Sequence, residues 1–251
     1  MWQLLCQRTD IICCAHRTAP VPATERATSE VHENYNEAAI SKWYRHCSCF
    51  LSRAWRLMAA LGRQMLSIGH KITDFECDAY HDEQIKKVRL SSYEGKWLVL
   101  LFYPGDFTFV CPTELADAAA HYDQFTTLTA EVLSVSTDSA FAHKAWHDVS
   151  PSVKQVRFPM IADNAGKLSR YFGTYVEEFG ICVRASFIID PDGVVRACEF
   201  HDNRIGRSIE EILRKLQAAI FVRGHEDELC PANWRPGAKT LKPAIELVGK
   251  T

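Results

Sequence analysis

The sequence predicts an α/β domain in which a central β-sheet is flanked by helices. Short apolar runs, typical of strands buried on both faces, alternate with segments that carry helical patterns. Two of the helical segments begin with a recognisable start signal, a first-turn proline in one and a capping box in the other. The 251-residue chain has no run of eighteen apolar residues, so no membrane-spanning helix is expected.

The first half of the sheet and its helices follow one another in strict alternation. "WLVLLFY" (97–103) is the first buried strand, and "PTELADAAAHYDQF" (112–125) is the helix after it, with Pro112 in its first turn. "EVLSVST" (131–137) is the second strand, and "SAFAHKAWHDV" (139–149) is the second helix.

The second half predicts a hairpin followed by a long helix. "ASFIID" (185–190) and "VVRACEF" (194–200) are strands joined by the turn "DPDG". The last helix, over 208–222, opens with a capping box from Ser208 to Glu211. This order of elements is that of a thioredoxin-like fold, whose chemistry lies where the first buried strand meets its helix.

Charge and cysteine spacing exclude several classes of protein. The net charge is −2 and no basic stripe is present, so we expect no nucleic-acid partner. Of the ten cysteines, five fall in the first 64 residues and five are spread singly over the rest, and no CxxC pair occurs. This spacing does not resemble a secreted disulfide framework. If one of these single cysteines is a reactive thiol, it must be kept reduced, which predicts a cytoplasmic protein.

Residues 1–64 are predicted to be a poorly ordered extension, and residues 65–251 to be the folded domain. The extension contains the polar, aperiodic stretch "RTAPVPATERATSEVHENYNEAA". A mis-assigned start is the alternative, with Met65 as the initiator, because "MLSIGHKITDF" reads like the beginning of a domain.

The stretch "FYPGDFTFVCPTEL" (102–115) concentrates residues that activate a thiol. Cys111 is expected at the start of a helix, where the dipole and unpaired N–H groups stabilise a thiolate. Thr108 supplies a hydroxyl that can turn toward the sulfur, and Pro104 shapes the loop and screens it from water. The sequence therefore predicts a dry pocket that holds a reactive thiolate beside a hydroxyl.

These residues resemble the active-site signature P-x-x-x-T-x-x-C of the peroxiredoxins, of the alkyl hydroperoxide reductase C type within the typical 2-Cys group. The resemblance continues through "VSTDSAFAHKAWH", "RASFIIDPDG", "GRSIEEILRKLQA" and "CPANWRPG", and covers nearly all of residues 66–251. It implies a thioredoxin-like domain with the additions of the peroxiredoxins. It also implies a thiol peroxidase that reduces hydrogen peroxide and organic hydroperoxides in antioxidant defence, without a cofactor or metal.

The resemblance assigns a role to each residue of the motif. Cys111 matches the peroxidatic cysteine, which attacks the peroxide and becomes a sulfenic acid. Pro104 and Thr108 match its pocket partners, and Arg184 in "VRASF" matches the arginine that completes the pocket. Cys230 in "ELCPANW" matches the resolving cysteine, which attacks the sulfenic acid of the partner subunit and gives an intersubunit disulfide.

The resemblance also implies partners. It predicts a homodimer, and a ring of five dimers, with a dithiol protein as reductant, either a flavoprotein disulfide reductase or a thioredoxin-like protein. A holdase chaperone and a redox relay remain alternative functions. The GGLG loop and the C-terminal YF helix of eukaryotic-type members are absent from the sequence, which favours a robust, bacterial-type peroxidase over the chaperone.

Several other residues have competing interpretations. His143 and His147 have the spacing of a metal-binding pair but lack further ligands, so no metal site is predicted. Trp146 is expected to be a core or interface aromatic. Glu114 is expected either to form a hydrogen bond within the loop or to be an exposed first-turn acid. Three cysteines match no functional position and are expected to be structural: Cys77, Cys182 and Cys198.

Overall fold

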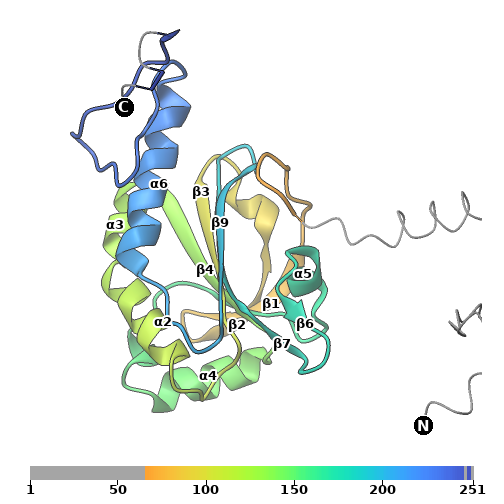
Figure 1. Cartoon of the computed structure of the whole chain (residues 1–251). Helices are drawn as coiled ribbons and strands as arrows, with labels where there is room; N and C mark the ends of the chain where they lie inside the picture. The colour runs from red at the N-terminus through yellow and green to blue at the C-terminus, as the bar shows by residue number, and fades with distance from the viewer. Residues whose placement is uncertain (1–65, 246–247, 250–251) are drawn as a thin grey trace, which may run out of the picture. The chain divides into compact units, whose positions relative to one another are not determined.

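The computed structural model describes residues 66–245 and 248–249 (Figure 1). The predicted extension over 1–64 lies outside the described residues. The strands are β1 (Glu76–His81), β2 (Gln84–Arg89), β3 (Trp97–Phe102), β4 (Ala130–Ser136), β5 (Met160–Ala162), β6 (Tyr175–Val176), β7 (Ile181–Cys182), β8 (Arg184–Ile189) and β9 (Val195–His201). The helices are η1 (Leu90–Tyr93), α2 (Cys111–Ala120), α3 (Tyr122–Thr127), α4 (Ala140–Val149), η2 (Val153–Gln155), α5 (Lys167–Tyr171) and α6 (Ile209–Gly224).

Seven strands form one mixed sheet in the order β2-β1-β5-β4-β3-β8-β9, and β6 pairs with β7 in a separate ribbon. The three strands β3, β4 and β5 are parallel, whereas β8 runs antiparallel to β3 and continues into β9. All six residues of β3 are buried. A parallel centre with a hairpin at one side fits the predicted thioredoxin-like α/β fold.

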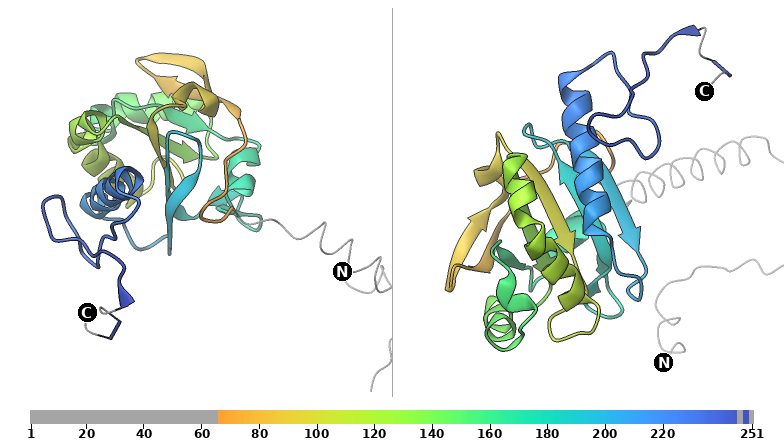
Figure 2. Two further views of the ribbon diagram at one scale, coloured as in Figure 1. Left: turned by 90° about the horizontal axis from the view of Figure 1, so that it is seen from above. Right: turned by 90° about the vertical axis from the view of Figure 1, so that its left-hand side faces the viewer.

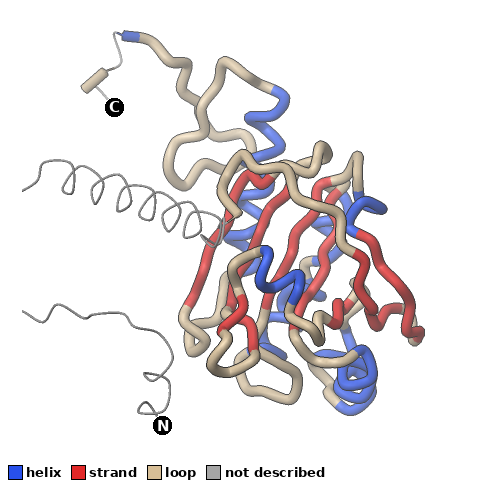
Figure 3. The backbone as a smooth tube through the Cα atoms, turned by 90° about the vertical axis from the view of Figure 1, so that its right-hand side faces the viewer, coloured by secondary structure: helices blue, strands red, loops and turns tan. Residues whose placement is uncertain are grey.

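Helices cover both faces of the sheet, and alternate residues of β3 serve the two faces. Val99 and Leu101 pack in the core under α2, α3, α4 and α6, whereas Leu98 and Leu100 pack in the core on the side of α5. Figure 2 shows α2 and α6 side by side over one face, and Figure 3 shows α5 in front of the other. Among the described residues, no helix combines the length and apolar character needed to cross a bilayer.

The four predicted strands are confirmed within one residue at each end, and the predicted "DPDG" turn joins β8 to β9, with Gly193 at φ 78°. Burial is confirmed for β3, β4 and β8, whereas β9 lies at the edge of the sheet and alternates between more buried and exposed residues. The single helix predicted over 112–125 is wrong. Two helices occupy this stretch, because α2 ends at Ala120 and α3 begins at Tyr122. His121 between them has φ −94° and ψ 0°, which turns the chain at that point.

The β1–β2 hairpin carried no recognisable signal in the sequence. Its two-residue turn, Asp82–Glu83, has positive φ at both positions (51° and 59°). Such turns favour Asn-Gly or Gly, which this sequence lacks there. The pair is held instead by the surrounding sheet, since β1 also pairs with β5.

Candidate active site

Cys111 is the first residue of α2 and follows the loop that leaves the end of β3. The helix begins as predicted, with Pro112 in its first turn and no side chain capping its N-terminus. The Cys111 residue is fully buried. A sulfur at this position faces the positive end of the helix dipole in surroundings from which water is excluded.

Arg184 reaches the sulfur from the neighbouring strand. It opens β8, which pairs with the end of β3 through Ala185 and Phe102. Its Nη1 donates to Cys111 Sγ at 3.4 Å, and its Nε donates to the carbonyl oxygen of Asn203 at 3.0 Å. A fixed guanidinium charge at this distance favours the thiolate over the neutral thiol.

Glu114, one turn into α2, holds Arg184 in place. Its carboxylate accepts from Arg184 Nη1 at 2.5 Å and from Nε and Nη2 of Arg207 at 2.9 Å and 3.0 Å. Burial raises the pKa of Glu114, but the hydrogen bonds and charge of Arg207 outweigh burial and bring this pKa below its ordinary value. Glu114 is 3% exposed, so its interpretation as an exposed acid is wrong.

Arg207 was missed in the sequence. Its backbone N–H also donates to Glu114, and its Nη1 donates to the Ala185 carbonyl oxygen at 2.7 Å. It stands just before the capping box that begins α6. From the sequence, an arginine just before a helix is expected to be a surface residue, because no nearby residue indicates that α6 starts beside α2.

The loop between β3 and α2 carries Pro104, which is half-buried, and Thr108, which is exposed. The Thr108 hydroxyl donates to the Gly105 carbonyl oxygen at 2.9 Å. Within residues 66–245, no hydrogen bond joins Thr108 to Cys111, so the predicted turn of the hydroxyl toward the sulfur is not observed. A hydroxyl that donates its proton can still accept a hydrogen bond from a substrate.

Cys230 follows α6 in the sequence. It is half-buried and lines a groove of about 780 Å³ between β9, α6 and residues 230–233. Burial raises the pKa of Cys230, opposed by the charge of Arg214. Arg207, beside the Cys111 site, precedes the 16-residue α6, which is about 24 Å long. Cys230 lies along this helix and not past its end, because Arg214 and Ala218 of α6 line the same groove.

The remaining described cysteines have environments that disfavour a thiolate. Burial raises the pKa of Cys77 to about 11 and that of Cys182 to about 12, and it also raises the pKa of the more exposed Cys198. These three thiols are neutral near pH 7.

We expect iodoacetamide at pH 7.5 to alkylate Cys111 before Cys77 and Cys182, because alkylation consumes the thiolate. Peptide mapping by mass spectrometry at short times measures the order. In urea the order should disappear, since the raised pKa values of Cys77 and Cys182 depend on their burial in the folded protein. Early labelling of Cys182 in the folded protein would contradict this account.

The two histidines of α4 face different partners. The Nδ1 of His143 lies 2.8 Å from Asp106 Oδ2, whereas the Nδ1 of His147 lies 3.3 Å from the Tyr80 hydroxyl. No group of three or more possible metal ligands converges among the described residues. Trp146 is 3% exposed and packs on the ring of Tyr103, which confirms it as a core aromatic.

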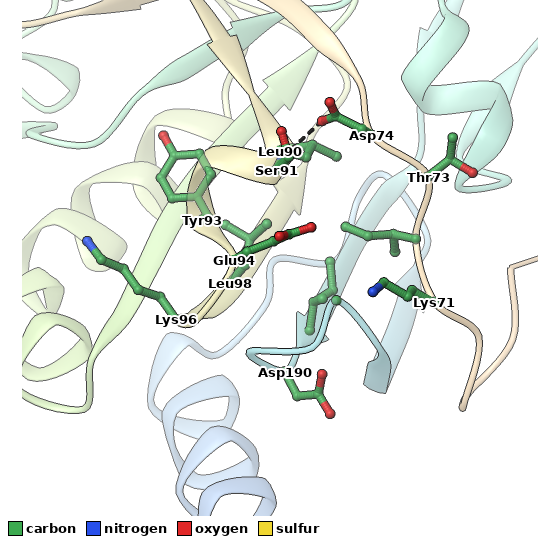
Figure 4. A pocket seen from close by; sticks show the side chains of 13 residues that line it. Lys71, Thr73, Asp74, Leu90, Ser91, Tyr93, Glu94, Lys96, Leu98 and Asp190 are labelled. Atoms are coloured by element: carbon green, nitrogen blue, oxygen red, sulfur yellow. Dashed lines mark hydrogen bonds between the residues drawn. The ribbon is translucent and has the colours of Figure 1, made fainter.

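A small hollow of about 40 Å³ lies away from this site, near the start of β3 (Figure 4). Asp74 accepts a hydrogen bond from the backbone of Ser91 across its wall, and Lys71 and Asp190 also line it. A volume of this size holds one or a few waters. Cys111 follows the opposite end of β3, so this hollow is separate from the thiol.

Two protein families match the chain. Residues 68–198 match the AhpC/TSA family, and residues 221–249 match the C-terminal domain of 1-Cys peroxiredoxin. The first match includes Cys111 and Arg184. The second includes Cys230.

Individual relatives match over all or nearly all of their length. Alkyl hydroperoxide reductase C of Pseudomonas aeruginosa (strain UCBPP-PA14) is 44% identical over 186 residues, which are 74% of this chain and 100% of the relative. The Escherichia coli K12 protein of the same name is 43% identical with the same coverage. The crystal structure of Enterococcus faecalis AhpC has 47% identity and a TM-score of 0.65, covering 66% of this chain and 100% of the other. Reduced 2-Cys peroxiredoxin of Plasmodium vivax has 30% identity and a TM-score of 0.68, covering 71% and 94%.

Proposed function

The chain belongs to the AhpC/TSA family and is a thiol-dependent peroxidase, and we propose that Cys111 is the residue that reduces the peroxide. The observation that carries this assignment is the 3.4 Å contact between Arg184 Nη1 and Cys111 Sγ, in a buried site at the first turn of α2. Helix and guanidinium both stabilise the thiolate, which is the nucleophilic form.

In the first half-reaction the Cys111 thiolate attacks the nearer peroxide oxygen. The S–O bond forms as the O–O bond breaks, and the leaving oxygen takes up a proton supplied by solvent and departs as water or an alcohol. Arg184 is placed to stabilise the negative charge that moves from sulfur to the leaving oxygen. Thr108 accepts a hydrogen bond from the peroxide O–H, and Pro104 helps to keep water out.

In the second half-reaction Cys230 of a second copy attacks the Cys111 sulfenic acid. The S–S bond forms and water leaves. Resolution between subunits is supported by the different surroundings of the two cysteines, since Cys111 is buried beside Arg184 whereas Cys230 lines the groove between β9 and α6. An external dithiol protein, either a flavoprotein disulfide reductase or a thioredoxin-like protein, then reduces the disulfide. This cycle supports a cytoplasmic setting, where thiols stay reduced.

A homodimer follows from this chemistry, and we extend the proposal to a ring of five dimers. Exposed aromatic side chains on the loop before Cys111 and on α4 are suited to contacts between copies. Phe109 is 94% exposed and Phe141 is 74% exposed. The open edge of β9, at the end of the sheet, is a second surface that is able to pair with another chain.

Cys230→Ser tests the two-cysteine cycle. In the pre-reduced protein without added reductant, we expect one rapid turnover of hydrogen peroxide at the wild-type rate constant, because Cys111 is intact. The peroxide-induced dimer band on a non-reducing gel should be lost. Stopped-flow kinetics and the gel measure the two effects.

The match of residues 221–249 to a one-cysteine protein makes this test decisive. If Cys230→Ser keeps a full wild-type dimer band after peroxide treatment, Cys230 is not the resolving cysteine. A Cys198→Ser variant serves as the control, because Cys198 lies on β9 outside the proposed pair.

A further inference from the structure

A buried polar cluster lies beside the Cys111 loop, and the chemistry proposed above uses none of it. His143 of α4 places Nδ1 2.8 Å from Asp106 Oδ2 and Nε2 3.1 Å from the Ile161 carbonyl oxygen in β5. Tyr103 donates to the other oxygen of Asp106 at 2.8 Å. The side chains of His143 and Asp106 are 0% and 1% exposed.

Both nitrogens of the His143 ring face acceptors, a carboxylate on one side and a carbonyl on the other. The ring therefore bridges the carboxylate of the loop and the backbone of the sheet. Burial and the nearby carboxylate hold the pKa of Tyr103 well above its ordinary value, so its hydroxyl remains a donor. The cluster therefore fixes both oxygens of Asp106.

Asp106 is the anchor of the loop. Its backbone N–H donates to Asp138 Oδ2 at 2.9 Å, and Thr108 follows two residues later, bonded to Gly105. Phe107, between Asp106 and Thr108, has φ 54°. A positive φ is uncommon for a residue other than glycine and persists only where the surroundings hold it. The position of Thr108 thus depends on how firmly Asp106 is held.

We propose that His143 is a positioning residue for the peroxide, acting through Asp106 to fix the turn that presents Thr108 to the substrate. This inference rests on the proposed role of Cys111. The chain of contacts runs from β5 through His143 to Asp106 and the loop, and tethers the loop to the sheet.

The groups that activate the sulfur belong to a separate set. Arg184 comes from β8, Glu114 from α2 and Arg207 from the residue before α6. Loss of the His143 contact should therefore slow the reaction of Cys111 with peroxide but not its alkylation by iodoacetamide, which needs the thiolate and not the Thr108 hydroxyl.

Two substitutions separate the two contacts of His143. In His143→Asn the amide nitrogen takes the place of Nδ1 and keeps a donor to Asp106. In His143→Gln it takes the place of Nε2 and keeps only the donor to the Ile161 carbonyl. We expect His143→Gln to lower the second-order rate constant for hydrogen peroxide roughly 10- to 100-fold. His143→Asn should stay within about threefold of wild type, since it restores the loop contact.

Stopped-flow kinetics measure the peroxide rate, and mass spectrometry of the Cys111 peptide measures alkylation, which should match wild type in both variants. His81→Asn is the matched control. His81 also lies between an aspartate, Asp82, and a backbone carbonyl, that of Arg157, and it lies on β1 away from the loop.

Equal peroxide rates in the Asn and Gln variants would overturn the proposal, as would a parallel loss of alkylation. If neither variant folds, Asp106→Ala breaks the same link from the loop side. It must then show the same selective loss, or the proposal fails. If Cys111→Ser reduces peroxide as fast as wild type, the failure lies with the role of Cys111 and not with His143.

Discussion

Replacing Cys111 with serine lowers the rate constant for peroxide reduction by roughly 1,000-fold or more, the scale of loss when a nucleophile is removed. The cause is that a serine hydroxyl is a far weaker nucleophile than a cysteine sulfur and forms no anion at neutral pH. Peroxide consumption with dithiothreitol as reductant measures the loss.

Cys77→Ser is the matched control for this substitution. Cys77 lies on β1 with its pKa raised to about 11 by burial, so we expect the rate constant to stay within about twofold of wild type. A Cys111→Ser protein that consumes peroxide at the wild-type rate would assign the chemistry to another group.

Glu114→Ala is expected to lower the free energy of unfolding by about 3–5 kcal/mol, because it leaves two buried guanidinium groups without their shared carboxylate. The side chains of Arg184, Glu114 and Arg207 are all 3% exposed or less, so solvent screening does not replace the lost partner. Urea unfolding followed by circular dichroism measures the change.

Glu76→Ala is the control for the Glu114 substitution. The exposed side chains of Glu76 and Arg89 pair at 2.6 Å, and surface pairs of this kind contribute about 0–1 kcal/mol. A loss from Glu114→Ala no larger than that from Glu76→Ala would show that the buried network does not stabilise the fold.

The same network predicts that the folded protein loses stability as the pH falls. The pKa of Glu114 is lower in the folded protein than its ordinary value of 4.5. The stabilisation is therefore fully present above about pH 4.5 and is lost as the pH falls through the folded pKa. Glu114→Gln, which cannot titrate, should flatten this part of the acid-unfolding curve relative to wild type. An unchanged slope would contradict the assignment.

The parts of the site that are local in sequence were predicted from it. Cys111 at the start of a helix follows from one stretch that holds a buried strand, a loop and Pro112. Arg184 came only from a resemblance, because a strand-end arginine has no local mark of function. Arg184 reaches the sulfur because β8 pairs with β3, and these two strands are far apart in the sequence.

The hydrogen-bond network behind Cys111 could not be predicted from the sequence, for the same physical reason. Glu114 and Arg207 are 93 residues apart, and their pairing depends on α6 beginning beside α2. The hydrogen bond from the Thr108 hydroxyl to the Gly105 carbonyl of its own loop was not predicted either. The link from His143 to Asp106 required the packing of α4 against β5.

The most direct test of the central claim is a peptide map of the wild-type protein after one equivalent of hydrogen peroxide, without reductant. We predict a peptide pair that joins Cys111 to Cys230, found in the non-reduced dimer band and absent from the monomer band. A Cys111 peptide that stays unmodified while another cysteine is oxidised would contradict the account.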